Sequence, residues 1–188
     1  MYIKNFRGYK EQTVEFYDNL NVIIGKNDVG KSTILEALEI FFNNESVKID
    51  TYDLNKKREN IEDKEIIIQV SFKIDHTKTY TIDTIPTQLS KEFLLDSNNY
   101  LTIRKVWNAS GQNITKTSLK TFLLSNYPIS KFPTPLICKK ITEIKKDLSK
   151  FEDTHDTSVI NKTICSSIRK AIYDFSNIQA SDLIETPI

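Results

Sequence analysis

The sequence has few of the residues that build disulfide scaffolds, metal sites or membrane spans. Its two cysteines, Cys138 and Cys165, stand far apart and lack a CxxC or Cys/His spacing, so we expect reduced thiols and no cysteine-bound metal. No apolar run approaches the roughly 20 residues that cross a bilayer. The opening residues, Met1 to Gly8, are too polar for a signal peptide. These absences predict a cytoplasmic chain without a membrane segment.

The sequence also lacks a charge imbalance. Lys and Arg number 26 and Asp and Glu number 25, which leaves a formal net charge of +1. No global field therefore favours nucleic acid, a membrane surface or an acidic substrate. The 188 residues, 39% of them hydrophobic, suffice for an ordinary buried core.

Glycine is scarce, with only 4 in the chain, yet two of these stand at a defined spacing. The segment from Gly25 to Ser32 reads GKNDVGKS and matches G-x-x-x-x-G-K-[ST], the Walker A pattern. The pattern places backbone N–H groups around phosphates at a helix N-terminus. The motif residues and the adjacent threonine are the predicted nucleotide contacts: Gly25, Lys26, Asn27, Asp28, Val29, Gly30, Lys31, Ser32 and Thr33.

Each fixed residue of this loop has a physical role. Gly25 and Gly30 permit backbone angles that a Cβ would penalise, and they let the main chain approach phosphate oxygens. Lys31 is expected along the β- and γ-phosphates, and the Ser32 hydroxyl is expected to ligate Mg²⁺. Thr33 can add a hydroxyl near the α-phosphate. The predicted ligands are therefore ATP and Mg²⁺.

The sequence around the loop has the context that this motif requires. Leu20 to Ile24 is a short apolar run that predicts a strand covered on both faces. From Lys31 to about Asn43, apolar residues recur at helical spacing. Before the loop, residues 3–6 and 13–16 are strand-like on either side of a turn at residues 7–10, which predicts an antiparallel pair.

The rest of the chain predicts a second, largely antiparallel sheet and then helices. Residues 44–64 are polar and read as an exposed connection. Strands are expected at 65–74, 79–85 and 100–107, with a helical turn near 88–95. Beyond Pro128, two helical stripes cover residues 137–148 and 160–175. We therefore predict domains at 1–127, a P-loop nucleotide-binding lobe, and 128–188, a helical segment.

Hydrolysis requires groups that the sequence does not supply. A Walker B strand, four apolar residues followed by Asp and usually Glu, is absent after Lys31, and no Asp-x-Asp pair exists anywhere. Residues 110–112 contain the Ser-Gly core of an ABC signature but follow a strand, so they read as a hairpin turn. Gln69 lies inside an apolar run and reads as a strand residue rather than a metal contact. The catalytic residues stay unknown.

Two stretches of this sequence resemble a known family. The motif from Ile3 to Gly8, Ile-Lys-Asn-Phe-Arg-Gly, followed by the run from Leu20 to Leu38, is similar to the start of an OLD-family ATPase. This family lies within the ABC-type ATPases that include RecF and the SMC proteins. Asn27-Asp28 in place of Asn-Gly favours the OLD side, and residues 52–55 and 94–103 resemble Gabija-type defence proteins.

The resemblance implies a fold, a site and partners. The fold is α/β, a P-loop ABC-type ATPase lobe with mixed and antiparallel sheet followed by C-terminal helices. Phe6 and Arg7 would contact adenosine. ATP would lie between this lobe and a second one, which a homo-oligomer or a partner ATPase lobe would provide. A Toprim nuclease domain and action on DNA, plausibly in antiphage defence, also follow from the resemblance alone. The sequence has no signature motif, Walker B or Toprim carboxylates, so it resembles only the N-terminal lobe.

Three functions stay open. The first is the ATP-binding lobe of an OLD-like ATPase, an enzyme only when completed by the missing Walker B, signature and Toprim elements. The second is a nucleotide-gated interaction module that binds ATP without hydrolysing it. The third is a small independent P-loop kinase, which would need a compact parallel sheet, whereas the middle of this sequence reads as antiparallel.

Overall fold

The computed structural model describes residues 1–25, 30–43 and 47–188, and these form two compact units. Unit 1 contains Met1–Ser71 and Ile103–Phe122, and unit 2 contains Phe72–Thr102 and Leu123–Ile188. Strands β6 (Leu101–Asn108) and β7 (Leu119–Tyr127) each contribute residues to both units. The units interleave along the sequence, and the predicted domains 1–127 and 128–188 stay a prediction.

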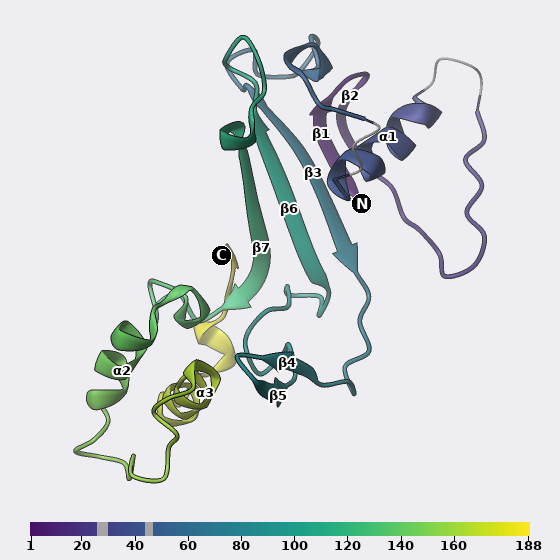
Figure 1. Cartoon of the computed structure of the whole chain (residues 1–188). Helices are drawn as coiled ribbons and strands as arrows, with labels where there is room; N and C mark the ends of the chain where they lie inside the picture. Colours follow the sequence, from purple (N-terminus) through teal and green to yellow (C-terminus); the bar gives the residue numbers. More distant parts are fainter. Residues whose placement is uncertain (26–29, 44–46) are drawn as a thin grey trace. The chain divides into compact units, whose positions relative to one another are not determined.

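Unit 1 contains an antiparallel sheet that starts at the N-terminus (Figure 1). Strand β1 (Tyr2–Phe6) pairs with β2 (Tyr9–Thr13), and Phe6 lies opposite Tyr9. The predicted antiparallel pairing at the N-terminus is thus confirmed. Its second strand was predicted at residues 13–16 but lies at Tyr9–Thr13, because a two-residue turn at 7–8 brings the next residues straight into register. On its other edge β1 pairs antiparallel with β3 (Glu65–Phe72). The strand order in this unit is β2-β1-β3-β6-β7.

Helix α1 (Lys31–Phe41) follows the glycine loop as predicted. Its buried residues recur on one face, and they are Ile34, Ala37, Ile40 and Phe41. This spacing matches the period of an amphipathic helix. The opposite face keeps Leu35 and Phe42 exposed, at 55% and 60% of their surface. Helix α1 therefore has apolar residues on a face that unit 1 does not cover.

The predicted strand at Leu20–Ile24 is wrong for this structure. The segment has no strand geometry, and its hydrophobic side chains are exposed: Leu20 by 82%, Val22 by 65% and Ile24 by 87%. A strand keeps its form when neighbouring strands bond its N–H and C=O groups, and no described strand pairs with this segment. The apolar pattern indicates a strand, but unit 1 by itself supplies no partner for it.

Unit 2 combines short strands with two helices. Strands β4 (Tyr80–Ile82) and β5 (Ile85–Thr87) form a hairpin, whose turn residues Asp83 and Thr84 both have positive φ. Strand β8 (Ile184–Pro187) pairs antiparallel with β7. The predicted C-terminal helices are confirmed as α2 (Ile141–Ser149) and α3 (Cys165–Phe175). Strands β7 and β8 were not predicted from the sequence.

Four short 3-10 helices complete the described elements, and they are Thr51–Asp53, Lys116–Ser118, Leu136–Cys138 and Ala180–Asp182. The third of these precedes α2 and explains why that helix starts at Ile141 rather than at 137. The fold class is thus α/β with an antiparallel sheet and few helices, as predicted. Among the described residues, no helix is long and apolar enough to cross a membrane.

The core of unit 2 surrounds a buried cation. Aromatic and aliphatic residues from β7, α2 and α3 form the apolar cluster, with Tyr127 and Tyr173 in contact through their hydroxyls at 3.3 Å. Arg169 of α3 is only 1% exposed. Its Nε donates to Glu92 at 2.8 Å and its Nη1 to Asp83 at 2.6 Å. Burial alone would lower the pKa of Arg169, but these carboxylates raise it above its ordinary value.

We predict that Arg169→Met destabilises the chain by about 3–5 kcal/mol, because it leaves the buried Glu92 carboxylate without its cation. Urea unfolding would measure the loss. The matched control is Lys162→Met, which breaks the exposed pair with Glu152 and should cost about 0–1 kcal/mol. Equal losses in the two variants would show that the Arg169 pair is no more important than a surface pair.

Candidate functional site

The candidate site begins at Gly30, the residue that caps the N-terminus of α1. Gly30 has φ 88° and ψ 10°, in the left-handed region that favours glycine. The Ile34 N–H donates to the Gly30 carbonyl at 3.3 Å and closes the first helical turn. N–H groups ahead of Ile34 have no intrahelical acceptor. The first turn of α1 contains no acidic residue, so its positive end can receive an anion.

A tyrosine of β2 lies directly against this cap. The Tyr9 hydroxyl donates to the Gly30 carbonyl oxygen at 3.1 Å. A Cβ added to Gly30 would lie 2.6 Å from the Tyr9 Oη and 2.8 Å from its Cζ. Both the backbone angle and the close tyrosine therefore require glycine at position 30. The Walker A pattern explains the glycine but gives no indication of Tyr9.

The chemistry-bearing residues of the loop lie at the start of α1. Lys31 is its first residue, and its Nζ donates to the Gly25 carbonyl at 2.5 Å. The ammonium thus reaches back to the first glycine of the motif. The Ser32 side chain is exposed and Thr33 is half-buried, both in the first turn. Lys26, Asn27, Asp28 and Val29 lie outside the described residues, and their predicted contacts stay predictions.

Phe6 and Arg7, assigned to adenosine by resemblance, have different surroundings. The Phe6 ring is 0% exposed and belongs to the core of unit 1. The Arg7 guanidinium lies over that ring, 5.1 Å from its centre. Its Nε donates to Asp53 at 2.7 Å, and its Nη1 pairs with Glu36 of α1. Arg7 therefore reaches α1 within the same unit, and the adenosine role of both residues stays a prediction.

Part of the segment that the sequence indicated as an exposed connection holds this arginine in place. Besides Asp53, Asn55 is only 4% exposed and donates to the Arg7 carbonyl at 2.7 Å. Leu54 forms a bridge with Phe6. Asp50 and Asp53 form a capping box around the short helix at 51–53, and this Asp-x-x-Asp spacing was the available signal. Residues 50–55 are therefore an integral part of unit 1.

The far end of α1 is anchored by a buried lysine of β6. Lys105 is 8% exposed, and its Nζ donates to the Phe41 carbonyl and to Asn43 Oδ1, each at 2.7 Å. Burial lowers its pKa below the ordinary value. Helix α1 has no basic residue in its own last turn, so β6 supplies the cation that suits a helix C-terminus. Periodicity gave no indication of this role, because Lys105 lies inside a strand.

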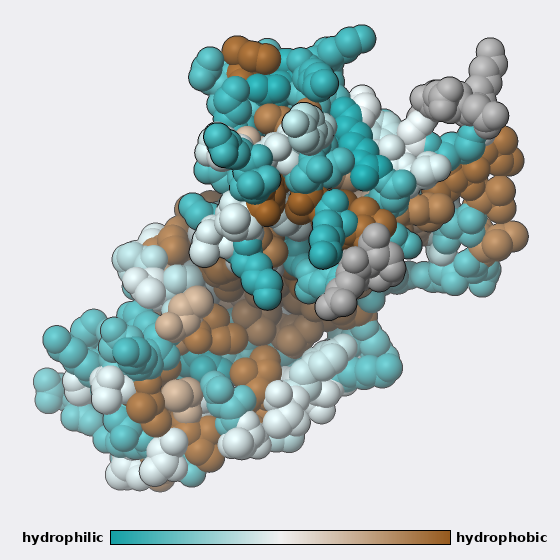
Figure 2. Space-filling view, turned by 45° about the horizontal axis from the view of Figure 1, so that its top comes forward, coloured by the Kyte–Doolittle hydropathy of each residue, from teal (hydrophilic) through white to brown (hydrophobic). Residues whose placement is uncertain are grey.

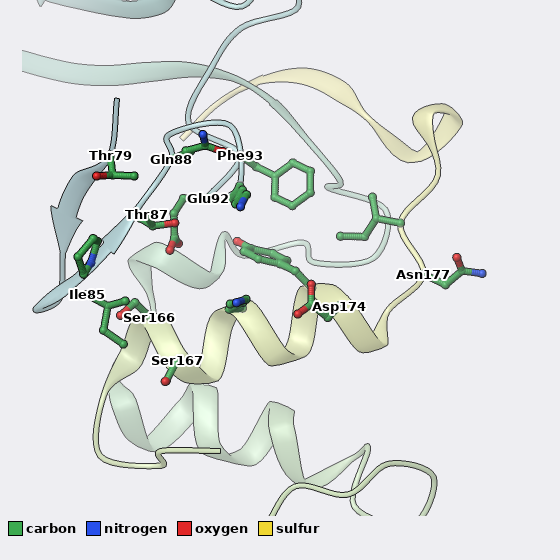
Figure 3. Close-up of a pocket in the computed structure, with 15 residues that line it drawn as sticks. Thr79, Ile85, Thr87, Gln88, Glu92, Phe93, Ser166, Ser167, Asp174 and Asn177 are labelled. Carbon is green, nitrogen blue, oxygen red and sulfur yellow. The ribbon is translucent and has the colours of Figure 1, made fainter. Parts of the chain in front are cut away.

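A separate cavity lies in unit 2 and contains none of the predicted site residues. It has a volume of about 770 Å³ and is lined by the β4–β5 hairpin, residues 88–93 and α3. Figure 3 shows hydroxyl and amide groups such as Thr87, Gln88 and Ser166 around it, and Glu92 is among the lining residues. The Glu92 carboxylate is already held by Arg169. None of the Walker A residues lines this cavity, whose lining includes Lys91 and Lys170.

A magnesium ion at the candidate site would need oxygen ligands. Across residues 1–25, 30–43 and 47–188, no group of three or more His, Cys, Asp and Glu side chains could hold a metal ion. Mg²⁺ in nucleotide sites takes most of its oxygens from phosphate and water. The exposed Ser32 hydroxyl fits this pattern as one oxygen ligand. Gln69 accepts from Arg104 at 2.9 Å on β3, as expected of a strand residue.

Comparisons with known proteins show which family the chain belongs to. The family model described as "AAA ATPase domain" matches residues 1–185. The RecF DNA replication and repair protein of Lactococcus lactis subsp. lactis is 30% identical over 114 residues, 58% of this chain and 29% of that protein. The DNA double-strand break repair Rad50 ATPase of Archaeoglobus fulgidus is 48% identical over 40 residues, 21% of this chain and 4% of that protein.

A further relative and a solved structure complete the comparison. The RecF protein of Acetivibrio thermocellus is 53% identical over 36 residues, 19% of this chain and 10% of that protein. The chain thus spans less than a third of each of these relatives. A structure titled "Structural biochemistry of ATP-driven dimerization and DNA stimulated activation of SMC ATPases" has TM-score 0.40 and 15% identity, covering 92% of this chain and 95% of the other. By the family match over nearly its whole length, this nucleotide-binding chain belongs to the AAA ATPase domain family and is related to RecF and Rad50.

Proposed function

We propose that this chain is the ATP-binding lobe of an OLD-like ATPase that acts with a nuclease on DNA in antiphage defence. The observation that carries the nucleotide part is the start of α1. Gly30 in the left-handed conformation leads directly into Lys31 and Ser32, at a helix end without an acidic residue. This combination of backbone donors, helix dipole and lysine suits a polyphosphate.

The residues of the site have separate tasks in this proposal. Backbone N–H groups at the start of α1 bind phosphate oxygens, and the Lys31 ammonium leaves the Gly25 carbonyl to lie along the β- and γ-phosphates. Ser32 offers its exposed hydroxyl as a ligand for Mg²⁺. When bound, Mg²⁺ would neutralise charge on the phosphate oxygens. Arg7 pairs with Glu36 of α1 and so connects the end of β1 with that helix.

Hydrolysis requires a second set of groups in this proposal. The sequence contains no Walker B carboxylate and no signature motif, which a homo-oligomer, a partner lobe or a longer chain would supply. The exposed run with Leu20, Val22 and Ile24 supports completion, since its apolar side chains are those of a buried strand. Figure 2 shows hydrophobic residues gathered at the right edge of that view, where this extended segment lies. Leu35 and Phe42 are exposed as well.

The narrower parts of the proposal rest on different support. Asn27-Asp28 in the loop favours the OLD side of the group, and the Gabija-like segments suggest antiphage defence. Action on DNA is suggested by the names of the RecF and Rad50 relatives, which describe DNA replication and repair. A cytoplasmic location would suit such a role. The formal net charge of +1 gives no independent support for DNA binding.

A nucleotide-gated interaction module without hydrolysis is the second candidate. The missing Walker B residue favours it for the chain by itself. An independent P-loop kinase has less support, because the strand pairs with a described register, β1–β2, β1–β3, β4–β5 and β7–β8, are all antiparallel. The three candidates share nucleotide binding and differ in turnover, so binding and turnover are tested separately.

We predict that the 188-residue protein binds a non-hydrolysable ATP analogue and that Lys31→Ala weakens this binding at least tenfold, because the charged contact to the phosphates is lost. Isothermal titration calorimetry measures both affinities. The matched control is Lys48→Ala, which removes an exposed lysine that lies outside α1 and the motif. Equal affinity of wild type and Lys31→Ala would contradict the phosphate-loop role.

The magnesium ligand is tested by Ser32→Ala. We expect this variant to lose most of the affinity gain that Mg²⁺ gives the wild type, while affinity measured in excess EDTA stays close to that of the wild type. The same titrations with and without metal give the comparison. An unchanged Mg²⁺ effect in Ser32→Ala would remove Ser32 from the metal site.

Turnover separates the remaining candidates. We expect the purified chain to release no phosphate from ATP above the rate of Lys31→Ala, because it lacks the metal-binding and water-orienting carboxylates. A phosphate-release assay at saturating ATP measures this. A steady rate that Lys31→Ala abolishes would instead favour an independent enzyme.

A further inference from the structure

Tyr9 of β2 makes a contact that neither the motif nor the family match assigns to the site. Its hydroxyl donates to the Gly30 carbonyl at 3.1 Å, and the same carbonyl accepts the Ile34 N–H at 3.3 Å. A carbonyl oxygen has two lone pairs, so both bonds can exist together. The orientation of this carbonyl is therefore fixed from two directions, by the helix and by β2.

The orientation of the Gly30 carbonyl determines the direction of the next N–H group, that of Lys31. The peptide bond between Gly30 and Lys31 is trans, since the described chain has no cis peptide bonds. In a planar trans peptide the C=O and the next N–H point in opposite directions. Holding the Gly30 carbonyl toward Tyr9 therefore directs the Lys31 N–H away from β2. This N–H belongs to the first turn of α1, whose donors bind anions.

Without Tyr9, only the bond from the Ile34 N–H at 3.3 Å would restrain this peptide plane. Gly30 has no side chain, and glycine populates positive and negative φ about equally. The Tyr9 ring occupies the space where a Cβ of residue 30 would lie, so the contact between Tyr9 and residue 30 is possible only when residue 30 is glycine. At the other end of α1, Lys105 holds the Phe41 carbonyl. Lys105 therefore restrains the C-terminal end of α1, and the bond from Tyr9 restrains its N-terminal end at Gly30.

We propose that Tyr9 is a positioning residue for the phosphate donors: its hydroxyl sets the Gly30–Lys31 peptide plane and so preorganises the Lys31 N–H for a polyphosphate. The inference rests on the proposed nucleotide binding and identifies a residue outside the motif that tunes it. Tyr9 acts through the Gly30 carbonyl and contributes no atom to the ligand. Its effect is confined to the phosphate part of a nucleotide.

The test is Tyr9→Phe, which removes the hydroxyl and keeps the ring. We expect affinity for a non-hydrolysable ATP analogue and for inorganic tripolyphosphate to fall by the same factor, about three- to tenfold, as for one lost hydrogen bond. The melting temperature should stay close to that of the wild type. The matched control, Tyr52→Phe, removes a hydroxyl from a tyrosine that is 82% exposed and should bind both ligands normally.

Three outcomes overturn the inference in distinguishable ways. Wild-type affinity in Tyr9→Phe would show that the hydroxyl does not position the donors. A loss for the ATP analogue without a loss for tripolyphosphate would show that Tyr9 contacts the nucleoside instead. Failure of the wild type to bind either ligand, or equal binding by Lys31→Ala, would refute the proposed function itself, and the positioning role with it.

Discussion

The peptide between Gly30 and Lys31 is the point on which the candidate site depends. A helix that binds phosphate must start with its N–H groups directed outward, and its chain must turn sharply before the first residue. Gly30 provides the turn through its left-handed φ, and Tyr9 fills the space that a side chain would need. The backbone conformation at Gly30 is therefore set jointly by a missing Cβ and by a tyrosine from a neighbouring strand. The position of Lys31, the first residue of α1, depends on this conformation of Gly30.

Unit 1 supports this helix by contacts along its length. Lys105 holds the C-terminal end, and Arg7 contacts Glu36 in the middle while it also bonds to Asp53. Asn55 donates to the Arg7 carbonyl and completes this connection. Ion pairs that are partly buried are stronger than fully exposed ones, because solvent screens them less. The helix is thus held by polar groups from β1, β6 and residues 50–55, besides its apolar face.

The same unit leaves large hydrophobic side chains exposed. Leu20, Val22 and Ile24 are exposed on a segment without strand geometry, Leu35 is exposed on α1, and Phe42 is exposed directly after it. Exposed apolar residues concentrated in one unit often mark an interaction surface. We propose that further strands, from a partner lobe or a longer chain, cover this surface.

The sequence by itself determined the local features. Two glycines at fixed spacing before a helical period gave the loop and α1, and the two stripes beyond Pro128 gave α2 and α3, because these signals depend on residues close along the chain. The pattern also indicated a strand at Leu20–Ile24, which requires partner strands that unit 1 does not provide. Tertiary structure alone decided the pairing of Tyr9 with Gly30, of Lys105 with Phe41, and of Arg169 with Glu92. These partners lie 21 to 77 residues apart, so only folding brings them together.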